Sequence, residues 1–541
     1  MCFLLLNKKI YDKIKGTSFL ERNFRFMEKC SCSYCPTIIV PGIGQSKVDL
    51  YSEDNKRIKC AWPLDVDTKL FIKRVIPSAL VLLITKRDKA FCKALKKAVS
   101  EMVTPLRVDK NGVPTENLHI VDYSGNSLKN CTPDEKRYIY KMVPMETLAE
   151  VIGEDHLYFF AYHSFGQPYE TAKRLDEYIQ NVKKETGHDK VNLIPVSLGG
   201  SIATAYFDAY GSKNDVNRVC YFVPATNGST LIADAFSKNI DLSNPVSLLA
   251  MFLDSGTVDT FTKIIKRFKE DTAKNIVNAF VDGILETFLK NCPGMWAVLP
   301  KEKYESFREK YLKGDEYNVL REKTDRFFKA QSNLREILTS LEKQGTRFFS
   351  ICGYDLPLLP FAGSKSVNSD TIVDFKSASL GGYSVAPGEK LPENYEPVYD
   401  RCQNREHNHI SPEGTVDLGT AIFPDSTFCF RYQVHDDTAY NDVALLLCKE
   451  ILTNENFTSV YSDPRFPQFN GTRDVFRIKY RLLPKVDELL KKDLPEDVRN
   501  SLLSSIKETE ELFANTIIKD RTEADEITKR FDEAVKKAEE V

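Results

Sequence analysis

The chain has no apolar run of membrane-spanning length and no surplus of charge of either sign. The nearest approach to such a run, residues 75–84, is closed by Lys86-Arg87-Asp88-Lys89, well short of the roughly 20 residues that a transmembrane helix needs. We expect this stretch to be buried in the core rather than to lie on a membrane surface or an acyl chain. The 75 basic and 77 acidic residues leave a net charge of -2, so no nucleic-acid partner is expected.

The 13 cysteines form no paired framework. Their odd number leaves at least one thiol free, which fits a reducing compartment. The first residues place a short apolar run before the positive charges, the reverse of a signal peptide, so we expect a cytoplasmic protein. Cys30, Cys32 and Cys35 stand close together, but three thiols without a fourth ligand at a suitable spacing make a weak zinc signal. No metal and no cofactor is predicted.

Segments with strand character alternate with segments of helical period. Short apolar, aromatic or β-branched runs occupy residues 37–40, 157–162, 191–196, 218–223, 347–352 and 427–432. Helical patterns separate several of them, including residues 169–186, which end at Gly187. This rhythm predicts an α/β fold with a mostly parallel sheet and helices on both faces.

The order of these segments and the shifts in composition predict five regions. They are an N-terminal extension (1–35), a first part of the core (36–226), a helical insertion (227–345), a second part of the core (346–478) and a helical tail (479–541). The insertion should form a cap over the carboxyl ends of the strands, where sheet enzymes bind ligands. The tail has one apolar stripe, which favours packing on its own domain over a homodimer or membrane-surface contact.

Residues 191–205 carry the strongest functional signal. An apolar strand runs straight into Ser197 and then into a helix of small residues that starts at Gly199-Gly200. This pattern is typical of a nucleophile elbow, a sharp strand-to-helix turn that exposes a serine hydroxyl, although an ordinary loop is the alternative. Pro195 stands where the usual Gly-x-Ser-x-Gly pattern has its first glycine, so the strand end must tolerate a missing ladder bond.

Histidine is scarce, with seven in the chain, so few residues are candidates for a catalytic base. A serine nucleophile needs a base to take its proton and an acid to orient that base. His435 directly follows the last predicted strand and follows the serine in chain order, as in hydrolases of this architecture. His163 follows a strand but precedes the serine. His407 and His409 resemble a loose metal pair, for which polar loop residues are the favoured interpretation.

Three carboxylates compete for the role of the acid, and chain topology alone allows any of them. Glu413 lies in a turn after Pro412, Asp417 follows Val416, and Asp355 follows the strand at 347–352. The oxyanion of the tetrahedral intermediate needs amide donors. Leu198 directly after the serine and Ile43 or Gly44 in the loop after the first strand are the predicted donors. A plain turn is the alternative interpretation of that glycine loop.

The chain resembles the lecithin:cholesterol acyltransferase and lysosomal phospholipase A2 branch of the α/β hydrolases, including bacterial relatives. The motifs that carry the resemblance are residues 39–46, Ala61-Trp62-Pro63-Leu64, the elbow, residues 412–417 and His435. The resemblance implies an α/β-hydrolase fold, assigns the acid to Glu413 because that position directly precedes Gly-Thr-Val, and places Trp62 near the acyl chain. A tryptophan of the core is the alternative for Trp62. Pro195 and the glutamate depart from the family pattern, as does the lack of a secretion signal and of a disulfide layout.

These features predict a serine esterase or lipase-like hydrolase of acyl esters, lipid or phospholipid esters included, which works through a Ser197–His435–acid triad and an acyl-enzyme. An acyltransferase with the same triad is one alternative. A non-catalytic, hydrolase-like binding or scaffold protein is another. The expected partner is an acyl ester or lipid substrate, with a peripheral membrane contact and a homodimer through the C-terminal helices as further options.

Overall fold

The computed structural model describes residues 32–64, 66–123, 127–143, 146–241, 256, 258, 263, 268–402, 404–470, 486, 488–514 and 521–540. Its centre is a seven-stranded sheet in the order β12-β11-β8-β7-β6-β1-β5. The strands are β1 (Thr37–Val40), β5 (Leu157–Phe159), β6 (Val191–Pro195), β7 (Val216–Phe222), β8 (Arg347–Tyr354), β11 (Thr427–Arg431) and β12 (Phe469–Asn470). Every neighbouring pair is parallel. The predicted α/β fold is confirmed.

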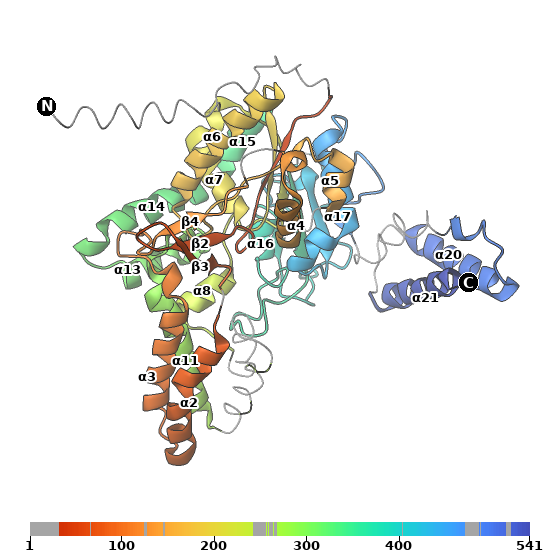
Figure 1. The fold of residues 1–541 in the computed structure, drawn as a ribbon. Helices are drawn as coiled ribbons and strands as arrows, with labels where there is room; N and C mark the ends of the chain where they lie inside the picture. The colour runs from red at the N-terminus through yellow and green to blue at the C-terminus, as the bar shows by residue number, and fades with distance from the viewer. Residues whose placement is uncertain are drawn as a thin grey trace, which may run out of the picture.

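Helices cover both faces of this sheet (Figure 1). On one face lie α6 (Pro168–Thr186) and α7 (Gly199–Tyr210), and on the other lie α4 (Pro133–Met142), α5 (Glu146–Ile152) and α17 (Asp442–Thr453). Successive strand residues point to opposite faces, so Leu193 belongs to the first core and Ile194 to the second. Because both faces are buried, the strands read as continuous apolar runs rather than as alternating ones.

The segment between β7 and β8 is helical over most of its described residues. Its helices are α8 (Thr230–Ser237), α11 (Glu270–Thr287), α12 (Pro293–Trp296), α13 (Lys301–Tyr311), α14 (Asn318–Ser332) and α15 (Leu334–Lys343). α14 and α15 pack against α7. Gly294 in α12 lies so close to the loop after β5 that an added Cβ would stand 2.7 Å from the Ser164 carbonyl oxygen. The segment therefore reaches from the α7 side of the sheet to the carboxyl end of β5.

A second insertion, between β1 and β5, forms a small antiparallel sheet and a helical lobe. The sheet has the order β3-β2-β4, formed by β2 (Val48–Tyr51), β3 (Arg57–Trp62) and β4 (Leu118–Ile120). The lobe contains α2 (Thr68–Thr85) and α3 (Lys89–Met102), and α11 packs along α3. Figure 1 shows these three helices projecting together from the body of the protein.

The outer face of α2 is exposed, which corrects the expectation that residues 75–84 are buried in the core. Phe71, Val75, Ala79 and Leu82 face the lobe, whereas a second apolar set faces solvent, formed by Leu70, Ile76, Leu80, Val81 and Ile84. The three-helix lobe buries one apolar stripe of α2 and leaves the opposite stripe uncovered. In the described part of the chain no helix is long and apolar enough to span a bilayer.

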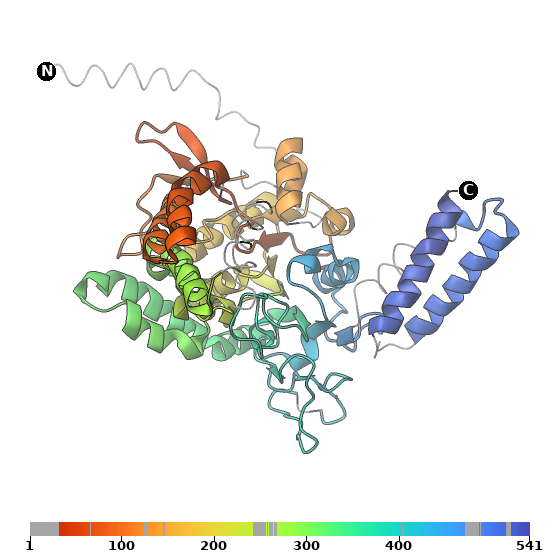
Figure 2. The same cartoon turned by 90° about the horizontal axis from the view of Figure 1, so that it is seen from below.

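The long segment between β8 and β11 contains little regular structure. It holds α16 (Phe375–Ala378) and a two-stranded ladder of β9 (Tyr383–Ser384) and β10 (Val416–Asp417). At the C-terminus, α20 (Glu496–Ala514) and α21 (Arg521–Glu539) pack side by side around a small apolar core of their own (Figure 2). A homodimer through this tail stays a prediction.

Candidate active site

Ser197 stands at a strained turn between β6 and α7. Its φ is 51°, a left-handed conformation that costs energy for a residue with a Cβ and that recurs at functional sites. Its amide donates to the Phe222 carbonyl oxygen at 3.1 Å, and its own carbonyl accepts from the amide of Ala225 at 2.8 Å. The turn is thus tied to the end of the neighbouring strand β7. Pro195 is the last residue of β6, and the Val196 amide restores the ladder by donating to Val40 at 2.9 Å.

Gly199 is required by the close approach of α7 to β1. A Cβ at this position would stand 2.1 Å from the Val40 carbonyl oxygen. A backbone atom of β1, which is hydrogen-bonded to β5 and β6 on its two sides, cannot move aside. We expect Gly199→Ala to destabilise the protein by about 3 kcal/mol, in the upper range for overpacked cores, as measured by chemical denaturation. Gly211→Ala is the matched control, since its added Cβ would meet only the flexible Leu341 side chain at 3.0 Å. Equal stability of the two variants would contradict the steric argument.

The structure brings His435 and Ser197 together. His435 follows β11 and precedes the short helical turn at Asp436–Tyr440. Its Nε2 lies 3.0 Å from the Ser197 hydroxyl oxygen, a hydrogen-bond distance at which the ring can accept the hydroxyl proton. Both side chains are largely buried, each residue with 8% of its surface exposed.

Asp370, in the irregular segment after β8, holds the other side of the imidazole. Its Oδ2 lies 2.7 Å from His435 Nδ1, and its carbonyl oxygen accepts from the His435 amide at 2.8 Å. The second carboxylate oxygen, Oδ1, accepts from the amides of Val373 at 2.7 Å and Ile372 at 3.1 Å. These bonds orient the carboxylate and fix the ring with its proton on Nδ1 and its Nε2 lone pair toward Ser197.

The pKa of His435 lies above its ordinary value. Burial disfavours the imidazolium, but the charge of Asp370 and its hydrogen bond to the ring stabilise it by more. The charge of Asp436 acts in the same direction. This electrostatic setting stabilises the charged ring that forms when serine gives up its proton.

None of the three carboxylates expected as the acid contacts His435. Asp355 pairs with Arg431 at 2.8 Å, and Asp417 accepts from the Tyr395 hydroxyl at 2.7 Å. Glu413 lies beside the Tyr354 phenol, whose pKa rises mainly through burial and partly through this carboxylate. The expected contact between Glu413 and His435 is therefore wrong: Glu413 lies beside Tyr354, and Asp370 occupies the position next to His435 Nδ1.

The glycine loop after β1 lies against the nucleophile. An added Cβ on Gly42 would stand 2.9 Å from Ser197 Cβ. The Gly42 amide is occupied by Gln45 Oε1 at 2.5 Å. Within the described residues no hydrogen bond uses the amides of Leu198, Ile43 or Gly44. The predicted oxyanion donors thus belong to the two segments that flank the serine.

Trp62 packs next to this loop. Its ring edge would lie 3.7 Å from a Cβ on Gly44, and it makes an edge-to-face contact with Phe165 at a centroid distance of 4.6 Å. His163 neighbours the same phenylalanine. Its Nδ1 accepts from the Phe165 amide at 3.1 Å, and burial lowers its pKa to about 4, so this histidine is held neutral and is not bonded to Ser197.

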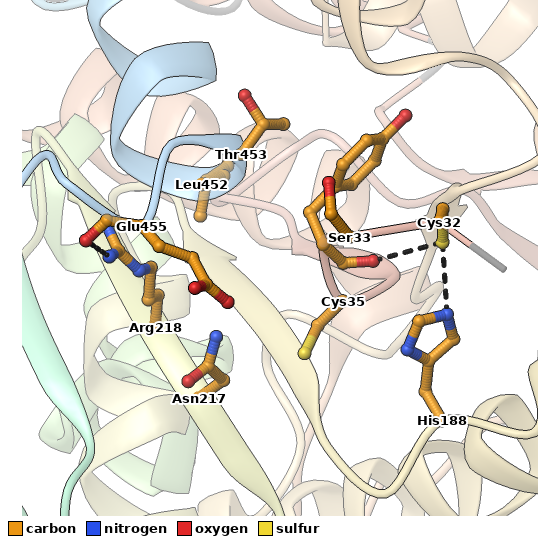
Figure 3. Close-up of a pocket in the computed structure, with 10 residues that line it drawn as sticks. Cys32, Ser33, Cys35, His188, Asn217, Arg218, Leu452, Thr453 and Glu455 are labelled. Atoms are coloured by element: carbon orange, nitrogen blue, oxygen red, sulfur yellow. Dashed lines mark hydrogen bonds between the residues drawn. The ribbon is translucent and has the colours of Figure 1, made fainter.

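The N-terminal cysteines divide between two environments. Cys32 Sγ lies 2.9 Å from His156 Nε2 and 3.2 Å from His188 Nε2, whereas Cys35 points toward Asn217 (Figure 3). Cys30 lies outside the described residues. The three-cysteine cluster considered from the sequence is therefore replaced by a cysteine with two histidines.

The sheet topology and the elbow define the class: an α/β fold with the serine after β6 and the histidine after β11, in the order found in α/β hydrolases. No protein-family model matches the chain, and no curated protein matches it. Among solved structures, phospholipase PlaB from Legionella pneumophila is similar at 14% identity and a TM-score of 0.25, covering 59% of this chain and 55% of its own. The similarity spans only about half of that protein, so its activity is not transferred, and the resemblance to the lecithin:cholesterol acyltransferase branch stays a hypothesis.

Proposed function

We propose that this protein is a serine hydrolase that cleaves acyl esters, with Ser197 as nucleophile, His435 as base and Asp370 as the acid that orients the base. The single observation that carries the proposal is the continuous hydrogen-bonded line from Asp370 through His435 to Ser197. The strained strand-to-helix turn at Ser197 adds to it, because backbone strain of this kind recurs at functional sites.

The geometry supports a two-step reaction. His435 Nε2 takes the hydroxyl proton while Ser197 Oγ attacks the ester carbonyl carbon, and the amide of Leu198 together with that of Ile43 or Gly44 stabilises the oxyanion. Collapse of this intermediate expels the alcohol, which receives the proton from His435, and leaves an acyl-enzyme. Water then attacks the acyl-enzyme with His435 again as base, which releases the acid and restores the serine.

A lipid-like ester is the substrate class that the protein's apolar surfaces favour. Trp62 and Phe165 form an aromatic wall beside the glycine loop, where an acyl chain would lie. The exposed stripe of α2 presents five large apolar side chains to solvent. The helix carries Lys69 and Lys73, an Arg74 that pairs with Glu101 of α3, and no acidic residue. Such a helix suits contact with an anionic lipid surface, in accord with the hypothesis drawn from the family resemblance.

The test of the proposed chemistry is covalent labelling with a fluorophosphonate, which phosphonylates an activated serine. We expect the wild type to be labelled once, and Ser197→Ala not to be labelled. Ser212→Ala removes an exposed serine at the end of α7 and should label like the wild type. A folded wild-type protein that resists labelling would favour a hydrolase-like scaffold instead. Product analysis with an added alcohol then separates hydrolysis from acyl transfer, since both pass through the same acyl-enzyme.

The membrane-facing role of α2 gives a separate prediction. We expect Leu80→Glu with Ile84→Glu to lower the rate on anionic phospholipid vesicles by at least about tenfold, because burying one such side chain stabilises by about 1.5–3 kcal/mol. The rate on a short soluble aryl ester should stay close to that of the wild type. Val319→Glu is the matched control, since it charges an exposed apolar residue of α14. Equal losses on both substrates would show damage to the fold and would contradict the proposed contact.

A further inference from the structure

A second group of reactive side chains lies at the opposite end of β11 from His435. Cys402, His407 and His409 come from the irregular segment that precedes β10, and Asp425 lies in the short helical turn directly before β11. One potential ligand atom from each of the four side chains falls within 4.8 Å of all the others. The group mixes one thiol, two imidazoles and one carboxylate, the ligand types that zinc takes in proteins.

The interatomic distances fit a single ion at the centre of the group. His407 Nδ1 lies 2.8 Å from Asp425 Oδ1 and 3.2 Å from Cys402 Sγ. Asp425 Oδ1 lies 3.6 Å from the same sulfur and 3.5 Å from His409 Nε2. In a tetrahedral zinc site the ligand atoms stand about 3.3–3.7 Å apart, as follows from Zn–N distances of about 2.0 Å and Zn–S distances of about 2.3 Å. Two of the observed distances, 3.5 and 3.6 Å, fall within this range, and the other two, 2.8 and 3.2 Å, are shorter.

Gln468 decides which nitrogen of His409 faces the group. The Gln468 amide nitrogen donates to the carbonyl oxygens of Pro424 at 2.6 Å and Thr427 at 3.3 Å, so its Oε1 is left as an acceptor. This oxygen lies 3.1 Å from His409 Nδ1, which must therefore carry the ring proton. His409 Nε2 then holds a lone pair, and it is buried without a hydrogen-bond partner in the described part of the chain. An outer amide that fixes the tautomer of a histidine is characteristic of metal ligands.

The charge and the burial of the group agree with this assignment. A Cys402 thiolate and the Asp425 carboxylate balance the two charges of a divalent ion, and the two histidines bind as neutral rings. Cys402 and His409 are buried, and the His407 ring is covered by Tyr461 at a centroid distance of 4.1 Å. With four protein ligands the site is closed to substrate, as in structural zinc sites.

We propose that Cys402, His407, His409 and Asp425 bind one structural zinc ion. On binding, the Cys402 thiol loses its proton to solvent, and four bonds form from the thiolate, the two imidazole nitrogens and the carboxylate oxygen. The ion ties the segment between β9 and β10 to the start of β11. His435 follows the other end of that strand, so the site supports the strand that positions the proposed base but contacts no reacting atom.

Cys32, His156 and His188 form a separate group with the same types of ligand atom. His156 Nδ1 lies 2.9 Å from Asp155 Oδ1, and a carboxylate only accepts hydrogen bonds, so in the neutral ring Nδ1 carries the proton and the Nε2 lone pair faces Cys32. His188 approaches the same sulfur at the edge of a small cavity (Figure 3). We infer a second zinc site here, with three protein ligands among the described residues.

The experiment is the metal content of the purified full-length protein, measured by element-specific mass spectrometry. We expect Cys402→Ser and His407→Ala each to lose one zinc per chain relative to the wild type. Cys32→Ser should lose the other zinc and keep the first. Cys60→Ser, which alters a half-buried thiol outside both clusters, should keep the wild-type content. His407 is partly exposed, so its variant remains informative if Cys402→Ser does not fold.

Gln468→Leu probes the outer contact while all four ligands stay in place. Loss of such a contact typically weakens metal affinity about 10–100-fold, and we expect that loss in competition with a chelator. Zinc content unchanged in both Cys402→Ser and His407→Ala would overturn the proposal, as would a wild type that carries zinc only at the Cys32 cluster. A stoichiometric metal other than zinc would overturn the choice of ion. Fluorophosphonate labelling of Ser197 reports on the proposed hydrolase separately.

Discussion

Ser197→Ala and His435→Ala are each expected to reduce kcat/KM for an aryl ester by nearly the same factor, up to about a million-fold. In the proposed mechanism the two groups act as a unit: the hydroxyl is a weak nucleophile unless the ring 3.0 Å away takes its proton. The double variant should be scarcely slower than either single variant. Initial rates with each purified protein, normalised to the folded fraction from circular dichroism, measure the effect.

The matched control for this pair is His163→Ala. That histidine is buried, follows a strand and was an alternative base, but it bonds to the Phe165 amide and not to Ser197. Its loss should leave the fluorophosphonate reaction of Ser197 in place. Additive losses in Ser197→Ala and His435→Ala, or full activity in either, would show that the two residues do not share one mechanism.

Asp370→Asn is expected to lower kcat by about ten-thousand-fold and to move the acidic limb of the pH–rate profile to lower pH. The size follows from the loss of the group that fixes the base's tautomer and stabilises its charged form. The sign follows from the His435 pKa, which lies above its ordinary value because of Asp370. The base works as a neutral ring, so activity falls as the pH drops through that pKa. Removing the carboxylate charge lowers the pKa and thus lowers the pH at which activity is lost.

Glu413→Gln is the control, because it neutralises the acid expected from the sequence. Glu413 makes no hydrogen bond to His435 in the described structure, so kcat and the acidic limb should stay close to those of the wild type. The comparison is measured as kcat against pH on one soluble ester for the three proteins. A large loss in Glu413→Gln together with near-normal Asp370→Asn would return the role of the acid to Glu413.

Local sequence patterns predicted much of the sheet and two members of the proposed triad. The strand expected at 37–40 is β1 itself, and the helix expected at 169–186 is α6 with one more residue. Strand β7 begins two residues earlier than expected, and β5 ends three residues earlier. Ser197 and His435 could be predicted because their signals are local. Ser197 stands between an apolar strand and two glycines, and His435 stands just after a strand.

The proposed acid and the proposed metal ligands could not be predicted from local sequence patterns. Asp370 stands among other polar residues in a long irregular segment, and no local signal separates it from Asp355, Asp417 or Glu413. Asp370 is distinguished by its hydrogen bonds in the folded protein, to His435 and to the amides of Ile372 and Val373. Likewise, the sequence favoured polar loop residues for His407 and His409, whereas the fold brings Cys402 and Asp425 close to them.

For this protein, the order of apolar runs, glycines and helix periods was enough to establish an α/β sheet with a serine elbow, because these signals depend on neighbours along the chain. The contact of Asp370 with His435, the exposed stripe of α2 and the two clusters of cysteine and histidine depend on the tertiary structure. Each depends on which distant segments pack together and on which surface stays exposed after they pack. A hydrogen bond of 2.7 Å between residues 65 positions apart cannot be predicted from the sequence around either residue.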